Sequence, residues 1–84
     1  MNTLNRTVIK KLKFDDMIYI YLSSGDVLTI PYDYTSKMQK TSKENLSKYH
    51  LIGGGIGVHF DEIDEDISLK GIIEYKLTHE LMAS

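Results

Sequence analysis

The sequence predicts an α+β fold in which a small antiparallel sheet of three to four strands packs against a C-terminal helix, with a short middle helix between them. Two observations lead to this prediction. In the first part of the chain, apolar residues alternate with polar or aromatic residues over several short stretches, which is the period of a β-strand. Near the C-terminus, leucine and isoleucine recur at every fourth position, which indicates a helix with one apolar face.

Length and composition indicate how many domains the chain forms and exclude several kinds of site. The chain has 84 residues, no cysteine and a formal net charge of −2. This length predicts a single domain over residues 1–84. The lack of cysteine excludes a disulfide scaffold, thiolate metal ligands and a cysteine nucleophile. No apolar run approaches the roughly 18 residues of a membrane span, and no signal peptide opens the sequence, so we expect a cytoplasmic protein without membrane contact.

The first predicted strand covers residues 6–14. Leu12 and Phe14 lie at alternate positions and should share one face of the sheet, whereas Ile9 breaks this alternation. Two aspartates follow and predict a tight turn, because aspartate tolerates a left-handed backbone and hydrogen-bonds to its own main chain.

The clearest strand is 17–23, where apolar residues alternate strictly with the others. Isoleucine and leucine form the face expected in the core, and Tyr19 and Tyr21 lie on the other face. A hairpin follows at Gly25, because glycine accepts the positive φ of a tight turn. The third strand, 26–31, ends at the chain's single proline, which cannot donate a hydrogen bond to a neighbouring strand.

The middle of the chain predicts a short helix. Residues 41–44 read TSKE, which has the form of a capping box with Thr41 as the N-cap and Glu44 three residues later. Leu46 and Tyr49 are the apolar residues with which this helix would contact the rest of the domain.

A fourth strand over 56–60 and a last helix over 69–81 complete the predicted fold, with Ser68 capping the helix. We expect all four strands in one sheet. The apolar face of the helix consists of Leu69, Ile73, Leu77 and Leu81. The predicted core consists of Leu12, Ile18, Ile20, Leu22, Leu28, Ile30, Val58, Ile67, Ile73 and Leu77.

Four glycines in five positions, from Gly53 to Gly57, invite comparison with phosphate-binding loops. Such a loop needs a lysine and a hydroxyl residue directly after the glycines, at the start of a helix. Here Ile56 and a predicted strand follow instead, and the glycine spacing of dinucleotide-binding folds is also absent. We interpret the glycines as a sharp turn in which the chain approaches a neighbouring strand closely.

His59 and the acids that follow it offer ligands for a metal and groups for acid–base chemistry. The acids do not have the spacing of a calcium-binding loop, and zinc prefers several histidines or cysteines. A weak site at His59 and Asp61, which share a strand face, remains the alternative. No nucleophile accompanies a base and an orienting group. We therefore expect no catalytic residue, no metal site and no cofactor, with Asp64 and Asp66 capping turns and the last helix.

Tyr19 and Tyr21 allow three interpretations. The first is that a helix covers them. The second is that they contact another protein, because tyrosine is enriched in interfaces. The third is stacking on single-stranded bases, for which Lys10, Lys11 and Lys13 come closest to the necessary basic residues. Nucleic acid ranks last, because the sequence lacks the overall basic charge typical of such binders.

Charge is distributed unevenly along the chain. Residues 1–50 contain eight Lys or Arg and five Asp or Glu, a balance of +3, whereas residues 51–84 contain two and seven, a balance of −5. Such asymmetry can steer a charged partner, although a solvated surface is the simpler interpretation.

Two long stretches carry a resemblance to a known family. They read SSGDVLTIPYDYTSKM (residues 23–38) and TSKENLSKYHLIGGGIGVHFDEIDEDISLKGII (residues 41–73). They resemble the bacterial family known as domain of unknown function 2442, whose signature GIHWPELDEDIS, followed by GLL, appears here as GVHFDEIDEDIS followed by GII. The resemblance covers about residues 8–73, and residues 74–84 form a helical extension.

The sequence departs from the family pattern at three positions. Phe60 stands where tryptophan is usual, Asp61 where proline is usual, and Ser24 where aspartate precedes the hairpin glycine. The resemblance implies a small α+β module that is sometimes fused to a helix-turn-helix and sometimes encoded beside a small partner in toxin–antitoxin-like gene pairs. It supplies no catalytic residues.

We therefore expect a non-enzymatic protein-binding module, the antitoxin-like or regulatory partner of another bacterial protein, encoded by a neighbouring gene. The first alternative is a mobile-element or phage inhibitor of a host nuclease or defence complex that acts by acidic charge mimicry. The second is a self-associating structural module, such as a homodimer. The expected contact residues are Asp61, Glu62, Asp64, Glu65, Asp66 and Tyr75.

Overall fold

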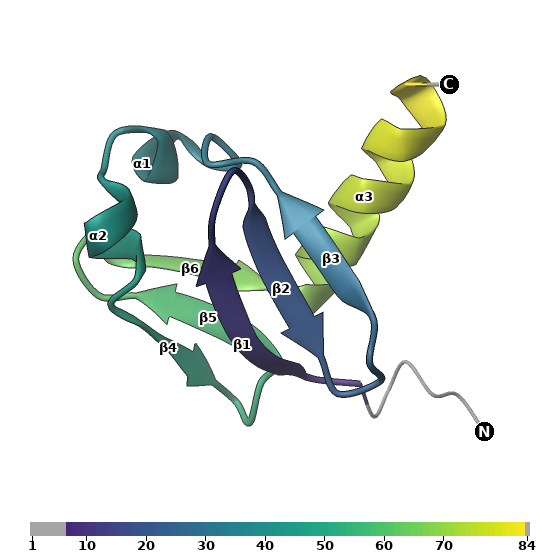
Figure 1. The fold of residues 1–84 in the computed structure, drawn as a ribbon, viewed down its shortest axis with the longest axis horizontal. Coiled ribbons are helices and arrows are strands. Elements are labelled where there is room, and N and C mark those ends of the chain that lie inside the picture. The colour runs from purple at the N-terminus through teal and green to yellow at the C-terminus, as the bar shows by residue number, and fades with distance from the viewer. Residues whose placement is uncertain (1–6, 84) are drawn as a thin grey trace.

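The computed structural model describes residues 7–83, with side chains up to His79. Over this range the chain forms two antiparallel sheets and three helices (Figure 1). In chain order the elements are β1 (Ile9–Phe14), β2 (Ile18–Leu22), β3 (Val27–Ile30), α1 (Ser36–Gln39), α2 (Lys43–Leu46), β4 (Tyr49–Ile52), β5 (Gly57–Phe60), β6 (Glu65–Ser68) and α3 (Leu69–Ala83).

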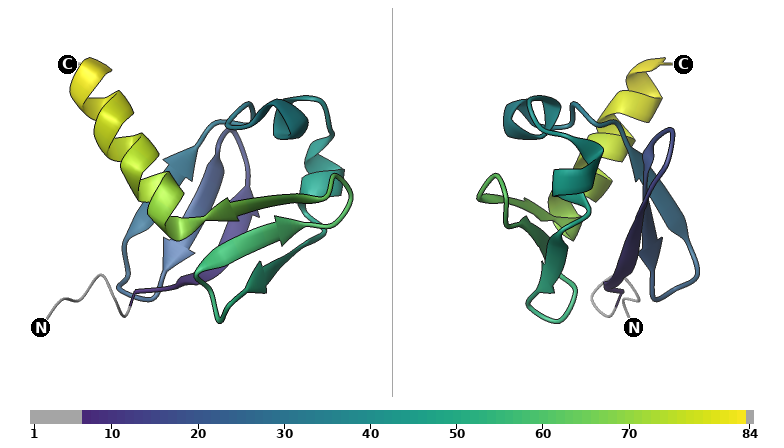
Figure 2. Two further views of the ribbon diagram at one scale, coloured as in Figure 1. Left: turned by 180° about the vertical axis from the view of Figure 1, so that it is seen from behind. Right: turned by 60° about the vertical axis from the view of Figure 1, so that its left-hand side comes forward.

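The strands form two three-stranded sheets, the N-terminal sheet (β1–β2–β3) and the C-terminal sheet (β4–β5–β6). The sheets lie as two facing layers, and α1 and α2 lie at one end of them (Figure 2). This confirms the α+β class with antiparallel strands, short middle helices and a C-terminal helix. The expectation of a single sheet was wrong, because 57–60 pairs with 49–52 and 65–68 and not with the first three strands.

Two strands, β4 and β6, were absent from the prediction. Tyr49, expected on the middle helix, begins β4 instead, and the glycines after it have positive φ and turn the chain back into β5. In β6 the sequence EDIS buries a single apolar side chain, Ile67, so it lacks the alternation that identifies a strand.

A β-bulge explains why Ile9 breaks the alternation of the first strand. The pairing of β1 with β2 shifts between Ile9, which pairs with Leu22, and Lys11, which pairs with Tyr21. The extra residue lets Ile9 and Leu12 both face the core, where they are 1% and 7% exposed.

The helix caps are partly as expected. The side chain of Ser42, not Thr41, caps α2 by accepting a hydrogen bond from the Asn45 backbone N–H at 3.1 Å. Ser68 is confirmed as a cap, because its hydroxyl accepts from the Gly71 N–H at 2.9 Å. The short helix α1 was not predicted.

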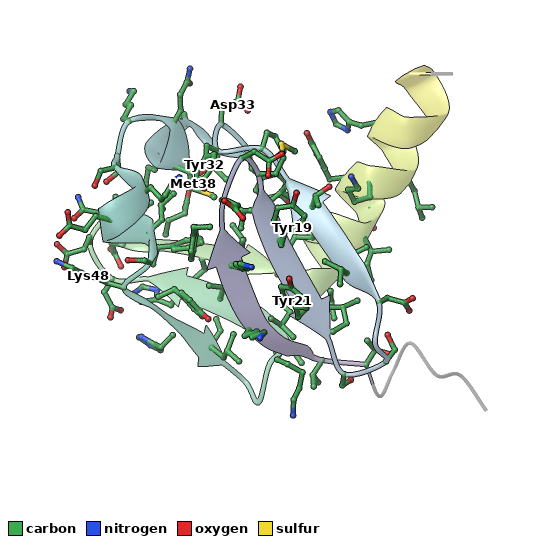
Figure 3. The ribbon with its side chains drawn as sticks, viewed as in Figure 1. Tyr19, Tyr21, Tyr32, Asp33, Met38 and Lys48 are labelled. Atoms are coloured by element: carbon green, nitrogen blue, oxygen red, sulfur yellow. The ribbon has the colours of Figure 1, made fainter. Side chains whose placement is uncertain are left out.

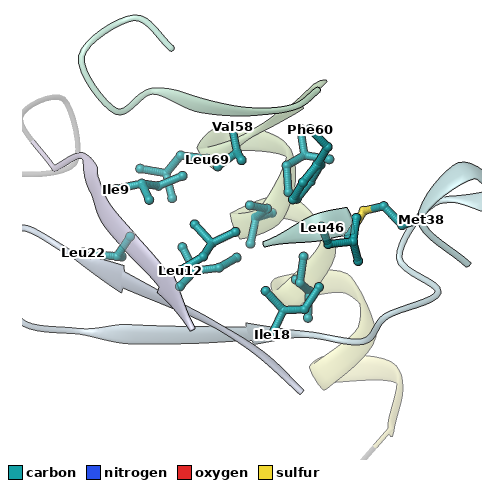
Figure 4. Close-up of a cluster of buried hydrophobic side chains, with 13 residues drawn as sticks. Ile9, Leu12, Ile18, Leu22, Met38, Leu46, Val58, Phe60 and Leu69 are labelled. Atoms are coloured by element: carbon teal, nitrogen blue, oxygen red, sulfur yellow. The ribbon is translucent and has the colours of Figure 1, made fainter. Parts of the chain in front are cut away.

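The core lies between the two sheets (Figure 4), and α1 and α2 contribute Met38 and Leu46 to it. Most predicted core residues are buried, although Leu28 and Ile73 only partly. Leu77 is a wrong prediction, since its side chain is 60% exposed, and Leu81 lies outside the described side chains. The buried residues that were not predicted are Ile9, Met38, Leu46, Phe60, Leu69 and Ile72.

Helix α3 extends the predicted 69–81 to Ala83 and leaves the two layers after its first turns (Figure 1). Among its residues up to His79, the buried ones are Leu69 and Ile72, near its start. Across residues 7–83, no helix is long and apolar enough to cross a membrane.

Candidate functional site

The outer face of the C-terminal sheet gathers two histidines and three aspartates. His50, His59 and Asp66 are direct neighbours across β4, β5 and β6. Asp61 and Asp64 approach them from the turn between β5 and β6. We name these five residues the acidic histidine cluster. Because the side chains of a strand alternate between its faces, this row points away from the core that Val58 and Ile67 enter from the other face.

His59 lies in the middle of the acidic histidine cluster, with carboxylates near both ring nitrogens. Its Nδ1 lies 2.5 Å from Asp66 Oδ1, and its Nε2 lies 3.4 Å from Asp61 Oδ1 and 3.9 Å from Asp64 Oδ1. The second histidine, His50, has its Nδ1 3.2 Å from Asp61 Oδ1. The His59 side chain is 25% exposed, so its ring is shielded while the carboxylates around it face solvent.

The turn that carries two of these carboxylates has a constrained backbone. Asp64 has a left-handed φ of 50°, which aspartate tolerates better than most residues. Its carbonyl accepts a hydrogen bond from Lys37 Nζ at 3.1 Å, which connects the turn to α1. The backbone of the turn is therefore connected to α1, while the Asp64 carboxylate, 93% exposed, faces solvent.

The carboxylates raise the pKa of His59 above its ordinary value of 6.5. The hydrogen bond from the ring to Asp66 is the largest cause. The negative charges of Asp66, Asp61 and Asp64 act in the same direction, while burial of the ring acts against them. The ring therefore binds a proton more readily in the folded protein than in the unfolded chain.

This pKa predicts how His59 affects stability with pH. Because the folded-state pKa is raised, the stabilisation is fully present below pH 6.5 and is lost as pH rises through the folded-state value. Titration of His59 by NMR should give a midpoint above 6.5, and Asp66→Asn should lower it. As pH rises from 6.5 through the folded-state pKa of His59, the melting temperature of the wild type should fall relative to that of His59→Gln. A wild-type midpoint at or below 6.5 would contradict the arrangement.

The carboxylates and imidazole rings of this cluster display charge and bind protons. The groups within reach of the His59 nitrogens are carboxylates, and no hydroxyl nucleophile contacts them among the described side chains. Within the same part of the chain, no group of three or more histidines, aspartates or glutamates is arranged to hold a metal ion.

Of the other residues expected at the contact surface, Glu62 lies on the turn of the cluster, whereas Glu65 and Tyr75 lie apart from it. Glu62 is exposed on the same turn, and Glu65 is half-buried on β6 opposite Phe60. Tyr75 lies on α3, at the other end of β6 from the turn. Its ring packs edge-on against Tyr34, with ring centroids 4.9 Å apart, so the structure does not join it with the acids in one surface.

Tyr19 and Tyr21 lie half-buried on the outer face of the N-terminal sheet, where no described helix covers them (Figure 3). The expectation that a helix covers them was therefore wrong. Their neighbours on β1 are Lys13 and Lys11. Lys10, the third lysine singled out from the sequence, is the extra residue of the bulge.

His50 is the cluster residue that the sequence analysis missed. It follows Tyr49, which was assigned to the middle helix, and only the pairing of β4 with β5 brings it beside His59, with ring centroids 5.3 Å apart. The alternation in YHLI, followed directly by a glycine turn and a second strand, is the signal of a hairpin that could have identified it.

Two facing three-stranded sheets with one C-terminal helix define a small α+β domain. The sequence profile of the family described as "Protein of unknown function (DUF2442)" matches residues 9–78, and the chain belongs to this family. The match extends beyond residue 73, where the resemblance was expected to end, and α3 is continuous across that point.

Two solved structures share the fold. A protein of unknown function from Rhodospirillum rubrum has a TM-score of 0.73 at 22% sequence identity, with 81% of this chain and 86% of that chain covered. An uncharacterized protein from Chromobacterium violaceum has a TM-score of 0.74 at 21% identity, with 86% and 69% covered. No curated protein matches the sequence significantly.

Proposed function

We propose that this protein is a non-enzymatic protein-binding module, the antitoxin-like or regulatory partner of another bacterial protein in the cytoplasm. The acidic histidine cluster, together with Glu62, forms the contact. The observation that carries the proposal is the charge of the C-terminal sheet. From residue 49 to residue 69 the chain contains five Asp or Glu and no Lys or Arg. The side chains of Asp61 and Asp64 are 49% and 93% exposed on a turn whose backbone is held in place.

Carboxylates displayed in this way suit a partner with a basic surface. Exposed ion pairs add little affinity, about 1 kcal/mol or less each, but complementary charge speeds association and rejects acidic competitors. His59 modulates this surface, because its protonated ring cancels part of the negative charge of Asp61, Asp64 and Asp66. The position of Tyr75 away from the turn makes it a separate anchor, if the partner extends along β6 to α3.

The alternative, inhibition of a host nuclease or defence complex by charge mimicry, rests on the same carboxylates. A nuclease surface that binds phosphates would accept a row of exposed carboxylates in their place. Self-association is the third proposal and would use the exposed edge of a sheet or α3.

The test is co-expression with the product of the neighbouring gene, followed by binding kinetics on the purified pair. The triple variant Asp61→Asn, Glu62→Gln, Asp64→Asn removes three charges from the turn while Asp66 continues to hold His59. We expect association to slow at least about tenfold at low salt, with a smaller change in dissociation.

The matched control removes three exposed charges elsewhere, with Asp15→Asn, Asp33→Asn and Glu44→Gln. It should leave association nearly unchanged. Equal effects of the two triple variants would show that net charge, not this surface, governs binding. A wild-type protein that does not co-purify with the neighbouring product would contradict the proposal.

A further inference from the structure

The outer face of the N-terminal sheet carries two matched rows of side chains. Antiparallel pairing places Lys13 directly beside Tyr19 and Lys11 directly beside Tyr21. The lysines are exposed, and the tyrosines on the middle strand are half-buried, facing outward (Figure 3). Because residues two apart on a strand are about 6.6–6.8 Å apart, both rows have the same spacing and stay in register.

Cations flank the tyrosine row on both sides. On the β1 side, Lys11 Nζ lies 5.0 Å from the centroid of the Tyr21 ring, a cation–π contact. On the β3 side, Lys76 of α3 reaches Thr29, whose hydroxyl lies 3.3 Å from its Nζ, and Thr29 is the direct neighbour of Tyr19. The rings therefore lie between two positive edges.

Acidic side chains are confined to the ends of this face. Asp16 in the turn between β1 and β2 accepts a hydrogen bond from the Tyr19 hydroxyl at 2.9 Å. Asp26 lies in the turn between β2 and β3, where Ser24 binds its carboxylate. Between the two turns, the outward positions of the strands hold lysine, tyrosine, threonine and valine. A ligand with negative charge would therefore be accepted over the strands and repelled at both turns.

We propose that this Lys–Tyr face binds single-stranded nucleic acid, with phosphates on Lys11 and Lys13 and two successive bases stacked on Tyr21 and Tyr19. Each nucleotide would use one lysine–tyrosine pair. Every base has a π-face, so stacking on tyrosine is tolerant of sequence. On binding, the Lys11 ammonium leaves the Tyr21 ring to pair with a phosphate, and a base takes its place over the ring.

The equal spacing of the lysine row and the tyrosine row favours single-stranded nucleic acid as the ligand over an acidic protein segment. An acidic peptide would use the lysines, but it has no flat groups to cover two neighbouring rings. The net charge of −2 does not oppose binding here, because the acidic histidine cluster belongs to the other sheet. At physiological salt, charges are screened over about 8 Å, so the local lysines dominate this face. The proposal uses a different surface from the protein-binding function and does not depend on it.

The test is fluorescence anisotropy with labelled single-stranded oligothymidylate and oligoadenylate, titrated with the full chain from low to physiological salt. Lys11→Gln with Lys13→Gln should weaken binding about tenfold at low salt and reduce the slope of log affinity against log salt by about 1.4, the value for two lost phosphate contacts. Tyr19→Thr with Tyr21→Thr should weaken binding about fivefold or more, while Tyr19→Phe with Tyr21→Phe should retain it.

The control variant, Lys40→Gln with Lys48→Gln, removes two exposed lysines outside this face and should leave affinity nearly unchanged. Circular dichroism melting identifies any variant that fails to fold. If the tyrosine variants do not fold, the comparison of Lys11→Gln with Lys13→Gln against the control variant still tests whether this face binds the oligonucleotide. The proposal is overturned if the wild type does not bind oligonucleotide at low salt, or if the two lysine pairs have equal effects. It is also overturned if poly-glutamate binds equally well and the threonine variants bind like the wild type, because the face would then hold any polyanion.

Discussion

Phe60→Ala should lower the free energy of unfolding by about 3 to 5 kcal/mol. Phe60 is the largest fully buried side chain, at 0% exposure, and it lies on β5, the middle strand of the C-terminal sheet. It belongs to the same buried cluster as Leu46 of α2 (Figure 4). Alanine would leave a cavity between the sheets, and the turns at both ends of β5 restrict how far the strand can move to fill it.

Urea unfolding followed by circular dichroism measures this loss. A domain of this size has a total stability of about 4 to 12 kcal/mol, so Phe60→Ala would remove a large part of it. Leu77→Ala is the matched control, since it truncates an apolar side chain that is 60% exposed and should change stability by no more than about 0.5 kcal/mol. Comparable losses in the two variants would contradict the assignment of the core.

The wrong placement of Leu77 in the core shows that a repeat of apolar residues is not sufficient to identify the buried face of a helix. A repeat of four residues advances by about 40° more than one full helical turn, because a turn holds 3.6 residues. Leu77 is two such steps from Leu69 and so has rotated by about 80° away from it. Ile72, three residues after Leu69, stays nearer the buried side and is 0% exposed. In addition, α3 leaves the sheets after its first turns, and no local pattern reports that departure.

The first three strands were predicted because alternation is a local property. The division into two sheets was not, because it depends on which strands pair, and pairing is set by turns. Strand β4 reads YHLI, and its residues were assigned to the middle helix, while β6 reads EDIS and contains a single apolar residue, too few to display a period. They become visible only once the glycine turn and the turn at Asp64 are known to bring them against β5.

The two candidate surfaces differ in how far the sequence determines them. A two-residue turn at the two aspartates would pair Lys13 with Ile18, whereas the turn in the structure also includes Met17 and pairs Lys13 with Tyr19, so the rows of the N-terminal sheet were derivable only in part. Their exposure was not, because it depends on where the helices pack. In the acidic histidine cluster, His59 and Asp66 are seven residues apart and meet only through the turn between them, and His50 joins through a strand that was not predicted.

The turn glycines give the last prediction. Gly55 has a φ of +107°, and its carbonyl accepts a hydrogen bond from the Ile9 N–H at 2.8 Å, which joins the β4–β5 turn to β1. A Cβ at this position would lie 2.6 Å from the Ile9 carbonyl oxygen and 2.9 Å from Val8 Cβ. Backbone strain costs about 1 to 3 kcal/mol and overpacking about as much again, so Gly55→Ala should destabilise the fold by about 2 to 6 kcal/mol.

Gly54→Ala separates these two costs, because Gly54 also has a positive φ, +70°, but a Cβ there would meet nothing within 4 Å. Its free energy of unfolding should fall only by the cost of placing alanine in a left-handed conformation, about 1 to 2 kcal/mol. Urea unfolding of both variants gives the difference, which reports the close approach of the turn to β1. Because Leu12 N–H also donates to the Tyr49 hydroxyl at 2.9 Å, shifting β1 to accommodate a methyl group would strain a second link between the sheets. Equal losses in the two variants would mean that the turn and β1 are not in contact, and that the glycines serve the turn alone.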